Sequence, residues 1–136
     1  MGILDGLMGK KEEPSRVGLP FNVSTSLRPV RLNARKENCL ELLVAVANAS
    51  DAPLMMSVSI EVPKSLGFEN LGITRIKEIR IGELPAQKEK TVGFSICANS
   101  QTPSGTYSAL LTVSQHYRDY SHVLNYAKKS VEVRVV

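Results

Sequence analysis

The chain has 136 residues, of which 43% are hydrophobic and 22% charged, and its formal net charge is +4. These values are typical of one soluble globular domain that can bury a core without disulfides or metals. Basic residues are scattered and aromatic residues make up only 5% of the chain, which argues against a nucleic-acid-binding surface. No apolar run reaches membrane-spanning length. We therefore expect a core of Val, Ile and Leu, which favours β-strands.

Residues 1–15 differ in composition from the rest of the chain, and the N-terminal segment is predicted to span 1–20. Ile3, Leu4, Leu7 and Met8 are spaced as on one face of a short helix. Three glycines weaken that helix, so we predict a flexible segment that is either a short amphipathic helix or disordered. The apolar face suggests a weak, reversible anchor on a membrane surface or in a partner groove. The alternatives are a frayed terminus and a segment that packs on its own sandwich, and all of these remain open.

Strand-like segments follow from Phe21 onward. The first, 21–32, contains Pro29, which confines it to a sheet edge or a break. The most apolar run is 39–48, in which alternate residues are predicted to face the core, namely Leu40, Leu42, Val44 and Val46. A turn rich in small polar residues ends this run.

The alternation continues over 54–62 and 89–98, and the second of these directs Val92, Phe94 and Ile96 inward. Residues 73–81 fit neither a helical nor a strand period, so we predict a strand with a bulge there. Further strands are predicted around 107–113 and 131–135. The spacing is typical of an all-β, immunoglobulin-like (fibronectin type III-like) sandwich over 21–136, with two antiparallel sheets and about seven strands.

Several short motifs within this region share a pattern. They are an apolar-x-apolar-x-Asn run at 44–48, a Leu-Pro turn at 81–85, a Thr-Val-x-Phe strand at 91–94 and a Gly-x-Tyr that opens a strand at 103–107. In these motifs the chain resembles bacterial and archaeal immunoglobulin-like modules of the CARDB and alpha-galactosidase-associated type over roughly 30–136. The resemblance implies a non-catalytic β-sandwich used for binding, spacing or assembly.

Two cysteines, Cys39 and Cys97, fall on the outward parity of two strands that should pair antiparallel. We therefore expect them to be cross-strand neighbours on an outer face. One hypothesis is a disulfide or redox pair. We favour two free thiols, because we expect a cytoplasmic location, where disulfides are rare. No further ligands stand at the spacing of a metal site.

The polar stretch 115–126 between the last two strands is predicted to be a loop. It holds the candidate protein-binding residues His116, Tyr117, Arg118, Tyr120, His122 and Tyr126. Tyr and Arg supply anchoring contacts in many interfaces. Two alternatives remain: a long hairpin whose tyrosines cover their own sandwich edge, and a weak metal pair formed by the two histidines with a nearby Asp.

No phosphate-binding loop, nucleophile elbow or metal-ligand motif occurs, so we expect no enzymatic activity and no cofactor. We predict a cytoplasmic adaptor or accessory subunit that binds protein through a sandwich face or the 115–126 loop. Two alternatives are a peripheral membrane protein tethered by residues 1–9 and a structural module related to surface-layer or adhesion proteins. Homodimerisation by strand addition stays open, and no nucleic acid partner is expected.

Overall fold

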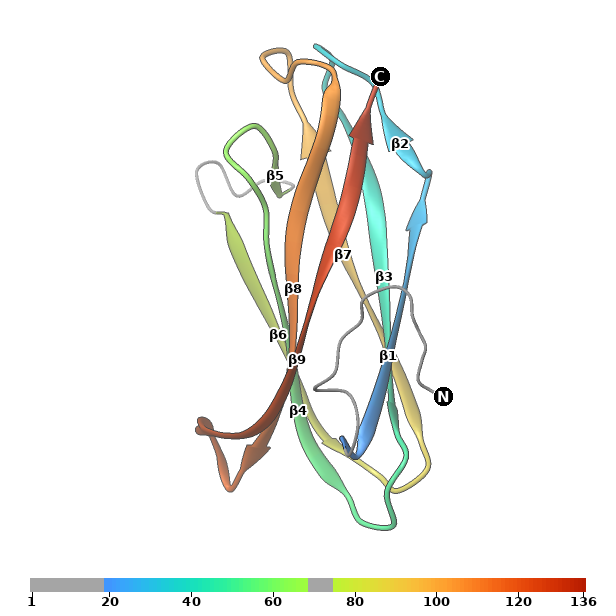
Figure 1. Ribbon diagram of the computed structural model, residues 1–136, viewed down its shortest axis with the longest axis vertical. Coiled ribbons are helices and arrows are strands. Elements are labelled where there is room, and N and C mark those ends of the chain that lie inside the picture. The colour runs from blue at the N-terminus through green and yellow to red at the C-terminus, as the bar shows by residue number, and fades with distance from the viewer. Residues whose placement is uncertain (1–18, 69–74) are drawn as a thin grey trace, which may run out of the picture.

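The computed structural model describes residues 19–68 and 75–136 (Figure 1). Within these ranges every regular element is a strand: β1 (Phe21–Arg28), β2 (Arg31–Leu32), β3 (Asn38–Asn48), β4 (Leu54–Glu61), β5 (Gly67–Phe68), β6 (Ile76–Leu84), β7 (Glu89–Ala98), β8 (Gly105–Tyr117) and β9 (Asp119–Val135). In this described part of the chain, no helix is long and apolar enough to cross a membrane. The predicted anchor residues Ile3, Leu4, Leu7 and Met8 lie outside the described residues.

The strands form two stacked sheets, one with the order β1-β3-β7-β5 and one with the order β2-β9-β8-β4-β6 (Figure 1). Each sheet turns alternate side chains toward the other. On β3 the predicted core residues Leu40, Leu42, Val44 and Val46 are at most 2% exposed, and on β7 Val92, Phe94 and Ile96 are also buried. Their partners on the facing sheet include Val58, Leu111 and Val113. The predicted all-β sandwich is therefore confirmed.

The strand order is that of an immunoglobulin-like domain. The sheet β1-β3-β7-β5 corresponds to immunoglobulin strands A, B, E and D, and β9-β8-β4 corresponds to G, F and C. The short β2 and the edge strand β6 are additions to this seven-strand plan. The chain changes sheet at Pro29, which follows β1 through a cis peptide bond and precedes β2. Proline cannot donate a ladder hydrogen bond, which explains the predicted break at this position.

β6 contains a bulge near its end, whereas Ile76 and Ile79, three residues apart in its regular part, face opposite sides and Ile76 is 56% exposed. Met56 of β4 lies opposite Gly82, but the next residue, Ser57, lies opposite Arg80, so Ile81 is an extra residue. Gly82 adopts a φ of 85°, a conformation that glycine tolerates better than other residues. The extra residue reverses the parity of the strand, so that both Ile79 and Leu84 pack on the core. This confirms the predicted bulge.

The prediction of a loop over 115–126 is wrong. β8 continues to Tyr117 and β9 begins at Asp119, so the stretch is the closed end of a long antiparallel hairpin with Arg118 at its turn. Figure 1 shows this end curling to one side at the lower left. Polar residues occur on both faces of the hairpin end, so the alternation that identifies a half-buried strand is missing from the sequence.

Candidate functional site

The end of the β8–β9 hairpin gathers exposed apolar side chains. Tyr117, Val123, Leu124 and Tyr126 are each 50–54% exposed and lie within ten residues of one another. We call these four residues, together with Arg118, the hairpin patch. Tyr117 and Leu124 line the same hollow, whereas Val123, next to Leu124 on β9, turns to the opposite face of the strand. Single exposed apolar residues are common, but four of them on one hairpin end make it a candidate interaction surface. Val123 and Leu124 were not among the sequence candidates, although a Val-Leu pair in a polar stretch was a usable signal.

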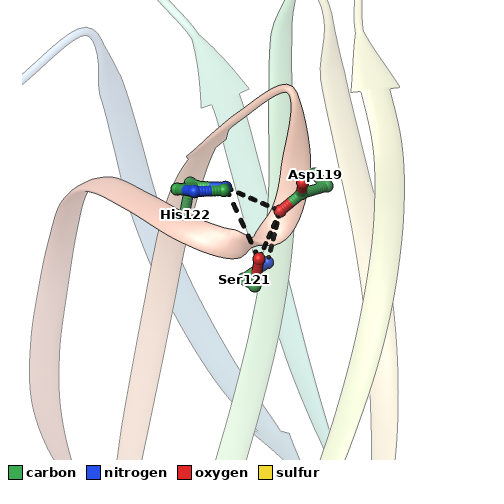
Figure 2. A network of polar contacts seen from close by, with 3 residues as sticks. All are labelled: Asp119, Ser121 and His122. Atoms are coloured by element: carbon green, nitrogen blue, oxygen red, sulfur yellow. Dashed lines mark hydrogen bonds and ion pairs between the residues drawn. The ribbon is translucent and has the colours of Figure 1, made fainter.

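A network of polar contacts fixes the turn beside this patch (Figure 2). Asp119 Oδ1 accepts hydrogen bonds from the Ser121 backbone N–H at 2.9 Å and from the Ser121 hydroxyl at 2.5 Å. The same oxygen lies 2.8 Å from His122 Nδ1. These contacts, the Ser121 hydroxyl first, lower the pKa of Asp119 to about 2. One carboxylate oxygen therefore accepts all three contacts within the turn.

Asp119, Ser121 and His122 do not form a catalytic triad. In a triad the acid and the nucleophile contact opposite nitrogens of the imidazole. Here the Ser121 hydroxyl lies 3.4 Å from Nδ1, the nitrogen that also faces Asp119. We therefore assign the three residues to the conformation of the turn.

Substitution of Ser121 by Ala is expected to raise the pKa of Asp119 from about 2 toward its ordinary value of 3.8, because the largest cause of the lowered value is removed. A lowered folded-state pKa means that the Asp119 contacts stabilise the hairpin end above about pH 3.8 and are lost as the pH falls through about 2. A ¹³C-carboxyl NMR titration measures this pKa. Ser130→Ala, on the same strand and outside the network, should leave it unchanged.

His116 and Tyr120 turn back toward the sandwich. His116 is only 6% exposed, and its Nε2 lies 2.7 Å from the Ser57 hydroxyl of β4. The Tyr120 ring meets the imidazole edge-on at 4.9 Å, and the Arg80 guanidinium lies 4.6 Å from the Tyr120 ring centroid. Tyr120 thus covers its own sandwich, as the alternative interpretation held, whereas Tyr117 and Tyr126 do not.

The two histidines have separate partners, Ser57 for His116 and Asp119 for His122. Among residues 19–68 and 75–136, no group of three His, Cys, Asp or Glu side chains is placed to hold a metal ion. The six sequence candidates therefore divide: Tyr117, Arg118 and Tyr126 belong to the hairpin patch, and the other three have structural contacts.

Cys39 on β3 lies directly opposite Cys97 on β7, as predicted. The Cα atoms are 4.0 Å apart and the two residues form a disulfide. Our preference for free thiols is therefore wrong. It rested on the expected compartment, whereas the strand register places the two cysteines directly opposite each other, with their Cα atoms only 4.0 Å apart.

Comparisons with known proteins identify the fold and not a family. No family model matches the chain, and no curated protein matches it. Similar solved structures include Salmonella alpha-2-macroglobulin, with a TM-score of 0.59 at 16% identity over 86% of this chain and 7% of that one. Escherichia coli alpha-2-macroglobulin has a TM-score of 0.56 at 16% identity, and the match covers 84% of this chain and 6% of that one. The alkylpurine DNA glycosylase AlkC of Pseudomonas fluorescens, bound to DNA with an abasic-site analogue, has a TM-score of 0.52 at 13% identity. The match covers 88% of this chain and 31% of that one.

At these identities the likeness concerns the fold alone, and the chain spans between 6% and 31% of the length of these proteins. The protein is an immunoglobulin-like β-sandwich. No family model supports the finer resemblance to CARDB modules. The architecture hosts many unrelated roles, so function has to be argued from the site.

Proposed function

We propose that the protein is a non-catalytic interaction module that binds a protein partner through the hairpin patch. The observation that carries the proposal is that four large apolar side chains at the end of one hairpin are half-exposed, two of which, Tyr117 and Leu124, line a hollow together with Arg118. Tyr and Arg are enriched among the residues that dominate binding energy. Val30 and Ile76 are also exposed, at 69% and 56%, but Val30 lies in the turn between β1 and β2 and Ile76 begins β6.

The fixed turn adds to the argument. Ordering a loop at an interface costs free energy, and a surface that is already ordered avoids part of that cost. The Asp119 network supplies hydrogen bonds within the turn that need no partner. Burial of the remaining exposed half of four such side chains would contribute roughly a few kcal/mol. That amount suits a specific but moderate interaction.

The double variant Val123→Ser/Leu124→Ser is expected to capture at least about tenfold less partner, since two of the four exposed apolar side chains are removed. The measurement is quantitative cross-linking and affinity capture with the full chain from an extract of the source cells. Val30→Ser/Ile76→Ser is the matched control: two exposed apolar residues change, and capture should persist. Equal capture by both variants would refute the hairpin patch as the binding surface.

A second candidate function has its own support. The Cys39–Cys97 disulfide suits an oxidising environment, because disulfides persist there and are rare in the cytosol. This favours a structural module related to surface-layer or adhesion proteins over a cytoplasmic adaptor. Both candidates use the sandwich for binding, and they differ in where the partner is found. Capture of the partner from the cell envelope fraction would support the surface-related module, and capture from the cytosol would support the cytoplasmic adaptor.

A further inference from the structure

β1 forms one edge of the sheet β1-β3-β7-β5, and no described strand lies on its outer side. The Pro20 carbonyl accepts a hydrogen bond from the Ala49 N–H at 2.9 Å, so the even-numbered residues of β1 direct their N–H and C=O groups toward β3. Asn48, opposite Phe21, instead donates its N–H to Lys88 on the far side of β3. The N–H and C=O groups of the odd-numbered residues of β1 therefore point to the outer edge, namely those of Phe21, Val23, Thr25 and Leu27.

The facing sheet protects its two long edges, whereas β1 does not. Directly opposed residues in a sheet point to the same face. On β9 Lys129 lies opposite the buried Leu111, and on β6 Lys77 lies opposite the buried Ile60. An inward-pointing lysine on an edge strand opposes the addition of another strand. The run 21–27 of β1 contains no charged residue, so its edge is open to strand addition.

The β1 edge is complementary to the same edge of a second copy. When two copies run antiparallel with Ser24 opposite Ser24, inward-facing residues lie opposite inward-facing residues, namely Phe21 opposite Leu27 and Val23 opposite Thr25. Counted over both copies there are four such pairs, and because each exchanges two hydrogen bonds, about eight hydrogen bonds form. On the outward face Asn22 lies opposite Ser26, so no like charges meet. A slip by one residue would place inward residues opposite outward ones.

We propose that the protein forms a two-fold symmetric dimer in which β1 pairs antiparallel with β1 of a second copy, with Ser24 on the axis. The two sheets then join into one continuous sheet, and because the interface is isologous the assembly closes at two copies. Pro20 and Pro29 bound the free stretch and limit its length. A contact made by one strand pair is small, so the expected Kd is on the order of 100 μM. This inference goes beyond the hairpin patch and does not depend on it.

The substitution Ser24→Cys tests the register. In the dimer the two introduced thiols face each other in a pair without ladder hydrogen bonds, where the Cα atoms are about 4.5 Å apart. Copper-phenanthroline oxidation of the full chain should therefore give a covalent dimer on a non-reducing gel. Ser26→Cys is the matched control, since both serines are exposed on the same face of β1. Its two copies are offset by four residues, about 13 Å, so it should link at least about tenfold less.

The substitution Thr25→Pro tests the hydrogen bonds. It removes an N–H from the outer edge, a position where proline is tolerated, and should weaken the dimer at least about tenfold because two hydrogen bonds are lost by symmetry. Ser130→Pro is the matched control on the edge of β9. Val136 donates its N–H to the Leu32 carbonyl on the outer side of β9, and Ser130 has the same parity, so its N–H also points outward. This variant should dimerise normally.

Sedimentation equilibrium of the full chain from about 10 μM to 1 mM brackets the expected Kd, and a ¹⁵N spectrum reports whether each variant is folded. A chain that stays monomeric throughout, equal linking of Ser24→Cys and Ser26→Cys, or a dimer that a folded Thr25→Pro variant leaves unchanged would overturn the proposal. Ser24→Cys combined with Val123→Ser/Leu124→Ser should link as Ser24→Cys does. If the combined variant fails to link, the hairpin patch and not β1 holds the two copies together.

Discussion

Reduction of the Cys39–Cys97 disulfide is expected to lower the free energy of unfolding by up to about 4 kcal/mol. The bridge joins residues that are 58 positions apart in the chain. A cross-link of that span removes loop-closure entropy from the unfolded chain, so breaking it favours unfolding. Urea unfolding with and without tris(2-carboxyethyl)phosphine measures the difference as a shift of the midpoint.

The control for this prediction is the double variant Cys39→Ser/Cys97→Ser. It should unfold near the midpoint of the reduced protein, and the reductant should not change that midpoint. The opposing result is equally clear. If iodoacetamide modifies both cysteines of the native protein without reductant, and the reductant leaves the midpoint unchanged, the thiols are free in solution and the cytoplasmic expectation regains support.

The core of this fold is readable from the sequence because burial on one face leaves a strict alternation. Leu40, Leu42 and Val44 share one parity of β3, and all are at most 2% exposed. The same parity placed Cys39 and Cys97 on the outer face and opposite each other. The alternation could not predict whether the two cysteines are oxidised. It constrains only their position, whereas the state of a thiol pair depends on distance and environment.

The hairpin end shows where that reasoning fails. His116 has the outward parity of β8, yet it is buried because Tyr120, four residues along the chain, lies against its ring. A contact of this kind depends on how the turn at Arg118 directs the two strands. The sequence therefore predicts that this stretch is unusual, but not which of its residues face solvent.

Asn48 shows what the asparagine of the 44–48 motif does in the structure. It ends the apolar-x-apolar-x-Asn run and is only 2% exposed. Its side-chain N–H groups donate to the carbonyls of Ala52, Leu84 and Pro85 at 2.8–3.1 Å. Its Oδ1 accepts from the Ser50 backbone N–H and hydroxyl. One side chain therefore ties the end of β3 to the turns that precede β4 and β7.

Substitution of Asn48 by Ala is expected to cost about 3 kcal/mol of unfolding free energy, because each buried polar group left unpaired costs about 1–3 kcal/mol. Urea unfolding of the variant measures the loss. Asn38→Ala is the matched control: Asn38 donates to the carbonyls of Asn33 and Lys36 and accepts from the Asn33 N–H. Those contacts are exposed, so water can replace them and the cost should stay below about 1 kcal/mol.

The comparison of these two asparagines separates burial from turn geometry. Both side chains bond to the backbone of neighbouring turns, but only Asn48 reaches across to a second segment, at Leu84 and Pro85. If the two variants lose equal stability, turn geometry sets the cost and the cross-link to β6 contributes little. A loss confined to Asn48→Ala would mean that the motif holds the two sheets together at this end of the sandwich, the end at which Leu54 and Leu84 close the core.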